Sequence, residues 1–317
     1  MNLPKITDID VAGKKVIVRL DLDTDPDLND LRIKASKETI EYLRSQNSTI
    51  IIIAHKGRPD GRIIESLSLK PFESLFPGCD VRENLRFNPG EDSNDDNFAR
   101  EIASWGDIYI NDAFASSHRN SASIVGVPKY LPHAIGFRFE KEIENLSEIF
   151  NNPKRPLIFL INGAKKDKLK YVDSLADLAD RVLVGGRLPE FLGDKGLESV
   201  RTQNGKVIVG NLVMDREDIT LNTIERFEKE IESAKTIVIS GPPGKFEDKG
   251  HLQGTERILK KIAENNQAFK VAGGGDTEKS INLLSLFEKF NWMSVGGGAM
   301  LEFLSKHTLP GIDVLMS

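Results

Sequence analysis

The sequence predicts an α/β fold in which parallel strands alternate with helices, in two halves of the chain. Four consecutive isoleucines at 50–53 form an unbroken β-branched run, which is typical of a strand buried on both faces of a parallel sheet. In the second half, several apolar runs end in glycine. The chain has 317 residues, more than one hydrophobic core usually spans, so we expect two domains.

The composition indicates a globular protein and argues against several classes. Hydrophobic residues make up 39% and charged residues 29% of the chain, unlike a disordered protein. The formal net charge of −5 argues against a nucleic-acid partner, so any basic site must be local. The single cysteine, Cys79, excludes an internal disulfide and is typical of a reducing compartment. The first residues lack a signal-peptide pattern and no apolar run could cross a membrane, so we expect a cytoplasmic protein without a membrane partner.

Strand and helix patterns alternate through the first half. We expect strands at 14–22, 50–54 and 107–112, and helices at 32–46 and 94–106. In the first of these helices, Ile33, Ile40 and Leu43 recur at helical spacing. This order favours parallel strands joined by crossover helices.

The second half has the same alternation after a charged connection. The helical stretch FEKEIENLSEIFNNPKRP at 139–156 ends in a proline-rich break and is expected to connect the two domains. Apolar strands then run into glycine at 157–163, 182–186, 207–210, 236–244, 269–275 and 293–298. A glycine just after a strand allows a sharp turn and lets backbone N–H groups approach an anion. One such turn is an ordinary connection, but the series favours a nucleotide or phosphate site.

A set of basic side chains in the first half begins a helix or follows strand and loop segments. It consists of Arg32, His55, Arg58, Arg86, His118 and Arg119. Ligands of open α/β sheets bind outside the carboxyl ends of the strands, and arginine can bind phosphate with two parallel hydrogen bonds. Taken singly, each side chain is more readily explained as a solvated surface group or a weak surface ion pair. Taken together, they favour a site for an anionic substrate.

The order of motifs along the chain is more specific than any single one. A G-x-G-x-x-G helix start is absent, and GPPGKF at 241–246 lacks the spacing and the Ser/Thr of a P-loop. The informative stretches, in order, are VIVRLDLD, LRIKAS, IIAHKGRP, SLKP, ENLRFNPGE, YINDAFASSHR, SIVGVPKYLP, EKEIENL, NPKRP, NGAKKDKL, GPPGKFE, GGGDT, VGGGAMLEFL and LPGI. On these motifs the chain resembles the phosphoglycerate kinase family from end to end.

The resemblance implies two Rossmann-like domains with parallel β-sheets flanked by helices, separated by a cleft. Residues 1–137 would form an N-terminal phosphoglycerate-binding domain, with 306–317 packing back on it. Residues 138–150 would be an interdomain helix, and 151–305 a C-terminal nucleotide-binding domain. The implied reaction is reversible phosphoryl transfer between 1,3-bisphosphoglycerate and ADP, giving 3-phosphoglycerate and ATP in glycolysis or gluconeogenesis. The implied cofactor is Mg²⁺, and the implied state is a monomer.

The resemblance assigns the basic cluster to the substrate. The implied substrate-binding residues are Asp21, Asp23, Arg32, His55, Arg58, Arg86 and Arg119. Asp21 would bind the substrate hydroxyl, and Arg32 would reach the transferring phosphoryl group. Because phosphoryl transfer depends on positioning and charge stabilisation, cations and amides are the expected catalytic groups. The implied catalytic residues are Arg32, Lys168 and Gly297.

The glycine-rich second half would hold the nucleotide. The implied nucleotide-binding residues are Gly163, Lys165, Lys168, Gly185, Pro242, Phe246, Glu247, Gly275, Asp276 and Thr277. Asp276 in GGGDT is the implied metal ligand, and Mg²⁺ typically takes one or two carboxylates plus phosphate oxygens. On the sequence alone, a helix N-cap is an alternative role for Asp276.

The chain departs from the family pattern chiefly in the nucleotide half. NGAKKDKL is one residue shorter than the family's Gly-Gly-Ala-Lys loop, and the stretch between 191–200 and 205–227 is much shorter than the family norm. The substituted positions are Asp23, Arg187, Ser240, Lys245 and Met300. Asp23 places a carboxylate near the anion site, where like charges weaken binding, and Arg19 or Lys56 are candidates to offset it.

Two hypotheses follow. The first is an active, compact phosphoglycerate kinase. The second is a non-catalytic relative that binds phosphoglycerate but has lost productive nucleotide binding. A cation such as Arg32 that acts only during transfer has no use in a binding protein, which favours the first hypothesis. The nucleotide preference stays open, because the base pocket is the changed part.

Overall fold

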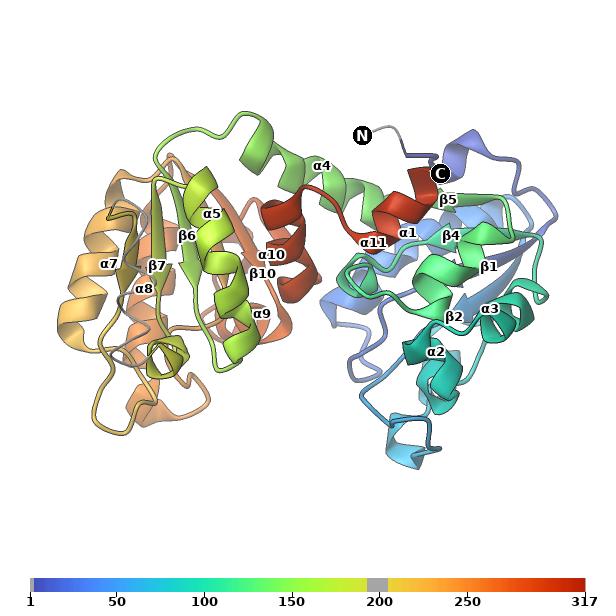
Figure 1. Ribbon diagram of the computed structural model, residues 1–317, viewed down its shortest axis with the longest axis horizontal. Coiled ribbons are helices and arrows are strands. Elements are labelled where there is room, and N and C mark those ends of the chain that lie inside the picture. The colour runs from blue at the N-terminus through green and yellow to red at the C-terminus, as the bar shows by residue number, and fades with distance from the viewer. Residues whose placement is uncertain (1–2, 193–204, 317) are drawn as a thin grey trace. The chain divides into compact units, whose positions relative to one another are not determined.

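The computed structural model describes residues 3–192 and 205–316 (Figure 1). The chain divides into two units, one formed by residues 1–144 and 308–317 and the other by residues 145–307. The segment FLGDKGLESV at 191–200, where the sequence indicates a shortened stretch, lies mostly outside the described residues. Each unit is built around one parallel sheet flanked by helices, as the sequence predicts.

The first unit contains a five-stranded parallel sheet with the strand order β3-β2-β1-β4-β5. Its strands are β1 (Lys15–Arg19), β2 (Thr49–Ile53), β3 (Asp80–Val81), β4 (Ile108–Asn111) and β5 (His133–Ile135). The predicted strands β1, β2 and β4 are confirmed, and all four isoleucines of β2 are buried. The sequence analysis missed β3 and β5, because runs of 2 and 3 residues show no usable periodicity.

The helices of the first unit cover its sheet and position part of the site. They are α1 (Leu31–Ser45), α2 (Pro89–Ser93), α3 (Asp96–Ala103) and α11 (Pro310–Asp313), and α4 (Phe137–Asn151) runs from this unit into the next. Ile33, Ile40 and Leu43 of α1 are buried in one cluster with side chains of β1 and β2, as their spacing predicts. Asp30 caps α1 by accepting a hydrogen bond from the backbone amide of Arg32 at 2.8 Å. The cap fixes Arg32 in the first turn of the helix.

The second unit contains a six-stranded parallel sheet with the order β11-β10-β9-β6-β7-β8. Its strands are β6 (Leu157–Ile161), β7 (Arg181–Val184), β8 (Val207–Val209), β9 (Thr236–Ser240), β10 (Phe269–Gly273) and β11 (Trp292–Ser294). Each predicted strand of this half is confirmed. The glycines predicted to follow them lie at the carboxyl edge of the sheet, because all of these strands run parallel.

The described helices of the second unit lie on both faces of its sheet. They are α5 (Val172–Leu178), α7 (Leu221–Ser233), α8 (Gln253–Glu264), α9 (Gly275–Leu283) and α10 (Gly297–Lys306). Figure 1 shows α7 and α8 on one face, and α5 and α10 on the other. The sheet is therefore covered on both sides, which is why its strands are apolar throughout rather than alternating.

Both sheets reverse their strand order once. The reversal lies between β1 and β4 in the first sheet and between β6 and β9 in the second. Connections from the two strands at a reversal run to opposite faces of the sheet and leave a crevice at its carboxyl edge, where ligands of such folds bind. The residues that follow these four strands are therefore well placed to bind a ligand.

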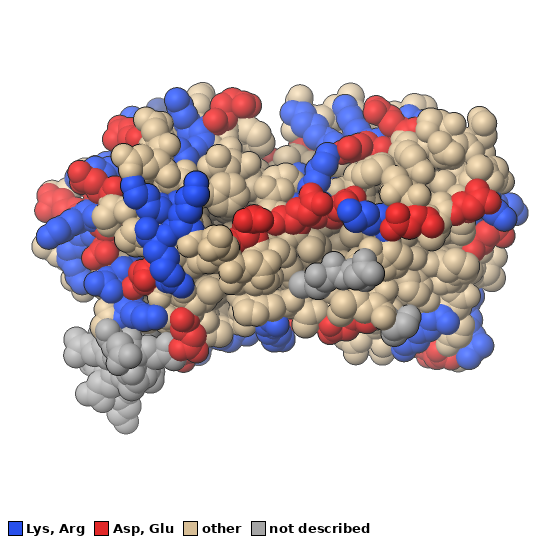
Figure 2. All heavy atoms as spheres, turned by 90° about the horizontal axis from the view of Figure 1, so that it is seen from above, with Lys and Arg blue, Asp and Glu red and all other residues tan. Residues whose placement is uncertain are grey.

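Charged side chains of both signs lie on the surface. On the face that Figure 2 shows, acidic and basic side chains are interspersed. Among residues 3–192 and 205–316, no helix has both the length and the apolar character needed to cross a membrane.

Candidate active site

Asp21 connects the loops that follow β1 and β4, the two strands at the reversal of the first sheet. Its buried carboxylate accepts hydrogen bonds from the backbone amide of Ala115 at 2.7 Å and from the hydroxyl of Ser116. Both donors belong to the short 3-10 helix η5 (Phe114–Ser116). Each carboxylate oxygen can accept a second hydrogen bond, so this geometry leaves Asp21 able to hold a hydroxyl group.

His55 follows β2 and is buried beside Arg19, the last residue of β1. Nη2 of Arg19 lies 2.6 Å from Nδ1 of His55. A guanidinium only donates, so Nδ1 accepts and the ring proton is on Nε2. Burial lowers the pKa of His55 well below its ordinary value. Neighbouring positive charges lower this pKa further, those of Arg19, Arg86, Arg119 and Arg32. At neutral pH the imidazole is therefore uncharged, with one N–H donor available.

Arg19 is fixed by a buried network. Its Nε donates to the hydroxyl of Ser123 at 2.9 Å, and that hydroxyl donates to Glu91 at 2.6 Å. The backbone amide of Ser123 donates to the same carboxylate at 2.9 Å. Glu91 is thus the buried counter-charge of this edge, a role that the sequence analysis did not identify. The short helix α2, which carries Glu91, is the feature that brings it there.

The expectation that Arg19 or Lys56 pairs with Asp23 is wrong. Arg19 points into the network just described, and Lys56 forms an ion pair with Asp25 at 3.5 Å. The Asp23 carboxylate accepts a hydrogen bond from the backbone amide of Gly57 at 2.8 Å. Burial lowers the pKa of Arg119, and the charge of Asp23 partly opposes this effect. A backbone donor therefore holds the carboxylate that the sequence places at this edge.

Arg86 and Arg119 add two guanidinium groups to the edge. Arg86 is 4% exposed, and it donates to Asp92 at 2.9 Å and to the carbonyl of Gly57 at 2.7 Å. Burial lowers the pKa of Arg119, and the charges of Arg86 and Arg58 lower it further. Nε of Arg119 is buried and has no hydrogen-bond partner in the part of the chain that the structure describes. A buried donor of this kind is costly unless a ligand satisfies it.

The other predicted substrate residues lie at the rim. Arg58 is exposed, and Arg32 is half-buried and donates to the carbonyl oxygen of Asp23. His118 is half-buried, next to Arg119 in the chain. The charge of Arg32 helps to lower the pKa of His55, so Arg32 lies close enough to interact electrostatically with the buried imidazole. The predicted basic side chains of the first unit thus gather at one edge of its sheet.

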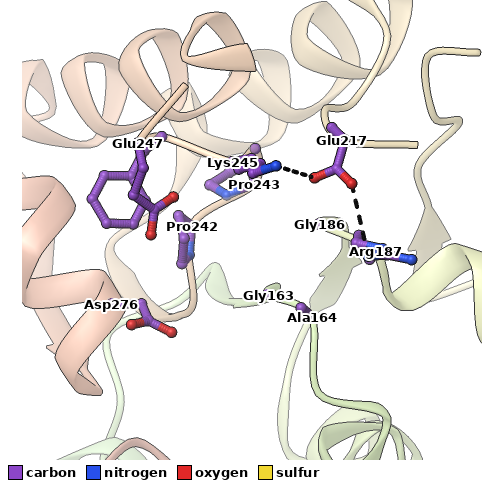
Figure 3. Close-up of a pocket in the computed structure, with 12 residues that line it drawn as sticks. Gly163, Ala164, Gly186, Arg187, Glu217, Pro242, Pro243, Lys245, Glu247 and Asp276 are labelled. Atoms are coloured by element: carbon purple, nitrogen blue, oxygen red, sulfur yellow. Dashed lines mark ion pairs between the residues drawn. The ribbon is translucent and has the colours of Figure 1, made fainter. Parts of the chain in front are cut away.

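A pocket of about 480 Å³ opens at the carboxyl edge of the second sheet (Figure 3). Among the predicted nucleotide residues, those that line it are Gly163, Pro242, Phe246, Glu247 and Asp276. Those outside its lining are Lys165, Lys168, Gly185, Gly275 and Thr277. The sequence analysis missed Ala164, Glu217 and Pro243, which also line the pocket. Of these, Glu217 carries no motif, and only the folding of its loop brings it to the pocket.

Glycine is required at the pocket walls because backbones meet there. Gly186 has φ +59°, and a Cβ added to it would lie 2.3 Å from the backbone nitrogen of Gly163. At Gly241, with φ +96°, a Cβ would lie 2.1 Å from the carbonyl oxygen of Asn162. Distances this short exclude any side chain unless the backbone moves. These glycines therefore bring together the loops after β6, β7 and β9.

Lys168 lies where the loops after β6 and β9 meet, in the 3-10 helix η8 (Lys166–Tyr171). Its Nζ donates to the carbonyl oxygens of Asn162 at 2.8 Å and Ser240 at 3.0 Å. Burial lowers the pKa of Lys168 to about 8, against the raising effect of Asp276. Lys165, by contrast, is exposed. The ammonium group of Lys168 is thus held close to the pocket by two carbonyl oxygens, and it loses its proton at a lower pH than an ordinary lysine.

Asp276 is the second residue of α9 and its side chain is exposed at the pocket. The N-cap of α9 is Gly274, with φ +104°, so the alternative role of Asp276 as an N-cap is wrong. The hydroxyl of Thr277 donates to the carbonyl of Gly273 at 2.9 Å and accepts from the amide of Gly241 at 2.7 Å. That hydroxyl is therefore engaged in holding two strand ends together and has no proton left for a phosphate.

The start of α10 lies against the start of α9. A Cβ on Gly297, the first residue of α10, would lie 2.9 Å from Cα of Gly274. Two helix N-termini with free backbone N–H groups thus meet, which favours an anion. Met300, one of the departures from the family pattern, is buried, and its sulfur would lie 2.7 Å from a Cβ on Gly273. The larger side chain is accommodated because its neighbour is glycine.

Comparisons with known proteins agree with this geometry. The family model described as phosphoglycerate kinase matches residues 6–76, 80–198 and 200–307. The phosphoglycerate kinase of Chloroflexus aurantiacus is 32% identical over 396 aligned positions, covering 99% of each chain. The chain belongs to the phosphoglycerate kinase family. The phosphoglycerate kinase of Rubrobacter xylanophilus is 33% identical over 387 positions, covering 99% of this chain and 98% of the relative.

Solved phosphoglycerate kinase structures are similar to this chain over nearly its full length. The enzyme from Coxiella burnetii has a TM-score of 0.81 at 28% identity and is covered over 99% of both chains. The structure from Pyrococcus horikoshii has a TM-score of 0.83 at 25% identity, over 99% of this chain and 98% of that one. Alignments with the relatives run over 387 to 396 positions, whereas this chain has 317 residues. The relatives therefore contain segments that this chain lacks.

Membership of the phosphoglycerate kinase family decides between the two hypotheses. The chain is a phosphotransferase with a carboxyl group as acceptor, which transfers a phosphoryl group reversibly between 1,3-bisphosphoglycerate and ADP in glycolysis. The non-catalytic alternative is not favoured, because the family model and the relatives extend through both units.

The contact between Gly186 and Gly163 leads to a prediction with a matched control. Gly205 has φ +68° and no atom within 4 Å of an added Cβ, so Gly205→Ala suffers only backbone strain, about 1 kcal/mol. We expect Gly186→Ala to lose about 2 kcal/mol more, because the backbone at Gly163 must move, and to raise the KM for ATP about tenfold. Urea unfolding and steady-state kinetics measure both. Equal losses and an unchanged KM in the two variants would contradict the role of this contact.

Proposed function

We propose that the basic edge of the first unit binds 3-phosphoglycerate or 1,3-bisphosphoglycerate. The single observation that supports this most strongly is the unpaired, buried Nε of Arg119 beside the neutral, buried His55. Together with Arg58 and Arg86 these side chains offer several N–H donors to one phosphate group. Asp21 accepts the substrate hydroxyl, and Asp23 lies beside the phosphate donors.

Arg32 is proposed as the catalytic residue of this unit. It lies in the first turn of α1, capped by Asp30, and its guanidinium bonds only to a backbone carbonyl among the hydrogen bonds of the described residues. A guanidinium that exchanges this bond for the oxygens of a transferring phosphoryl group stabilises charge that develops only in the transition state. Fixing the helix start by a cap limits the entropy lost when Arg32 reaches its target.

The second unit is proposed to bind ADP or ATP with Mg²⁺. Asp276 offers one exposed carboxylate, and no group of three or more His, Cys, Asp or Glu residues suited to a metal exists among residues 3–192 and 205–316. This fits a magnesium ion held by one carboxylate together with the phosphates of the nucleotide, which is how Mg²⁺ usually binds. When bound, the ion would neutralise phosphate charge. Amides of Gly275 and Gly297, at two adjoining helix starts, would support the phosphates.

The remaining nucleotide contacts are proposed for the pocket. Gly163, Pro242 and Phe246 line it and would pack on the nucleoside, and Glu247 would accept hydrogen bonds from ribose hydroxyls. Lys165 and Lys168 would bind the phosphates. Gly185 and Thr277, which lie outside the pocket lining, would hold its loops in position. We propose that the protein acts in the cytoplasm, as its single cysteine suggests, and as a monomer, because one chain carries both substrate sites.

Arg32→Ala tests the catalytic role directly. We expect kcat to fall about a thousandfold, because a cation acting on the transition state is lost, while the KM for 3-phosphoglycerate changes less than about threefold. Arg100→Ala is the control, since Arg100 is exposed and contacts Asp96 on the same helix at 3.0 Å and the ring of Tyr130, neither of which belongs to the site. A kcat for Arg32→Ala within about fivefold of the wild-type value would rule out this role.

Lys168 gives the reaction a predicted dependence on pH. Its pKa of about 8 means that the ammonium is charged below that pH and neutral above it. A phosphate ligand needs the charged form, so kcat/KM for ATP should fall about tenfold per pH unit above about pH 8. Lys168→Arg keeps the charge, and we expect this decline to disappear in the variant between pH 7 and 10. The same decline in both proteins would assign the titration to another group.

A further inference from the structure

The pocket of the second unit has a charged end that its proposed phosphate contacts do not use. Asp276 follows β10 and Arg187 follows β7, which lies three strand spacings away in the sheet, about 14 Å. If phosphates and Mg²⁺ bind at Asp276, the nucleobase extends toward Arg187. The other side chains at this end are Glu217 and Lys245, and Figure 3 shows Glu217 between the two cations, apart from Asp276.

The three side chains come from three different loops. Nη1 of Arg187 lies 3.8 Å from one carboxylate oxygen of Glu217, and Nζ of Lys245 lies 3.6 Å from the other. Both distances exceed a hydrogen bond, so the lone pairs of the carboxylate are not saturated. The loops themselves are fastened by the backbone, because the amide of Lys245 donates to the carbonyl of Glu217 at 2.8 Å and that of Arg187 to Gly163 at 3.0 Å. The side chains can therefore move while their loops stay in place.

A second ion pair keeps Arg187 at the pocket. Arg187 also pairs with Glu190 at 3.0 Å, and Glu190 pairs with Arg216 at 3.1 Å. Both partners lower the pKa of Glu190, which stays a carboxylate. Arg187 is half-buried and Lys245 is exposed, so separating them from Glu217 costs little, as for other solvent-exposed ion pairs. An entering base can thus displace the ion pairs at small cost.

We propose that Arg187, Glu217 and Lys245 form the base-binding end of the pocket and set nucleotide specificity. The two cations pack against the π surface of a purine base, where a guanidinium or ammonium group is attracted by the ring electrons. Glu217 accepts a hydrogen bond from an exocyclic amino group, as carboxylates do when they read base edges. A carbonyl oxygen at the same place would face the carboxylate and be repelled. Adenine carries an amino group at C6, where guanine and hypoxanthine carry a carbonyl, so the preferred occupant is an adenine nucleotide. This inference rests on the proposed nucleotide site.

Adenosine and inosine nucleotides test the proposal, because they differ at the exocyclic group. We expect wild-type protein to show a KM for ITP at least about tenfold above that for ATP, and Glu217→Gln to bring the ratio within about threefold, since an amide can donate as well as accept. Arg187→Ala and Lys245→Ala should each raise the KM for ATP about threefold to tenfold, with the KM for 3-phosphoglycerate unchanged.

Lys260→Ala is the matched control, because Lys260 is exposed on α8 and pairs with Glu256 at 2.6 Å, away from the pocket lining. An unchanged ATP to ITP ratio in Glu217→Gln, with unchanged nucleotide KM in both alanine variants, would overturn the proposal and leave the network a surface feature. Calorimetry with ADP and IDP measures the same differences in affinity without turnover. A chain that binds ADP selectively but transfers no phosphoryl group would therefore refute the proposed function while supporting this inference.

Discussion

Positive side chains gathered at the carboxyl edge of the first sheet repel one another, and the fold holds them together. The repulsion is visible in two groups: neighbouring cations help to lower the pKa of both His55 and Arg119. The buried Glu91 compensates Arg19 through Ser123, and Asp92 compensates Arg86. Compensation is incomplete, since a guanidinium N–H of Arg119 is left without a partner in the described residues. A bound phosphate would relieve the repulsion and accept a hydrogen bond from the unpaired donor, which is the physical basis of the proposed substrate site.

In the second unit, close contacts between backbone groups rather than cationic side chains shape the pocket. The strand order of its sheet reverses between β6 and β9, and the same kind of reversal places the basic edge in the first unit. Here glycines such as Gly186 and Gly241 let loops approach until no Cβ fits between them. The resulting pocket has two adjoining helix starts at one end and a charged network at the other. One topological rule thus yields two edges of different chemistry, the first proposed to bind phosphoglycerate and the second proposed to bind the nucleotide.

The strands and their direction could be predicted from the sequence because burial on both faces leaves a strong local signal. The isoleucines of β2 and the apolar runs of the second half are of this kind. The short strands β3 and β5 leave no such signal, since their pairing depends on neighbours that are distant in the chain. The basic cluster could be predicted as a set, because each member follows a strand or starts a helix.

The finer electrostatics of the site could not be predicted from the sequence. From the sequence, Arg19 is a strand residue close to Asp23, but its side chain is buried and donates a hydrogen bond to the hydroxyl of Ser123. Glu217 has no motif, and it reaches the pocket only because its loop bonds to the one that carries Lys245. Asp276 fits a helix cap by sequence, whereas the positive φ of Gly274 moves the helix start by two residues. In each case a hydrogen bond or backbone angle between distant segments decides the outcome.

The ionisation of His55 reports most directly on whether this edge is a phosphate site. Proton–nitrogen correlation spectra of the imidazoles, assigned with a His55→Gln variant, give its tautomer and its pKa with and without 3-phosphoglycerate. We expect the Nε2–H tautomer and a pKa well below the ordinary value in the free protein, and an upward shift of at least about one unit when the ligand saturates the site. An ordinary pKa in the free protein, or no shift at saturation, would contradict the account.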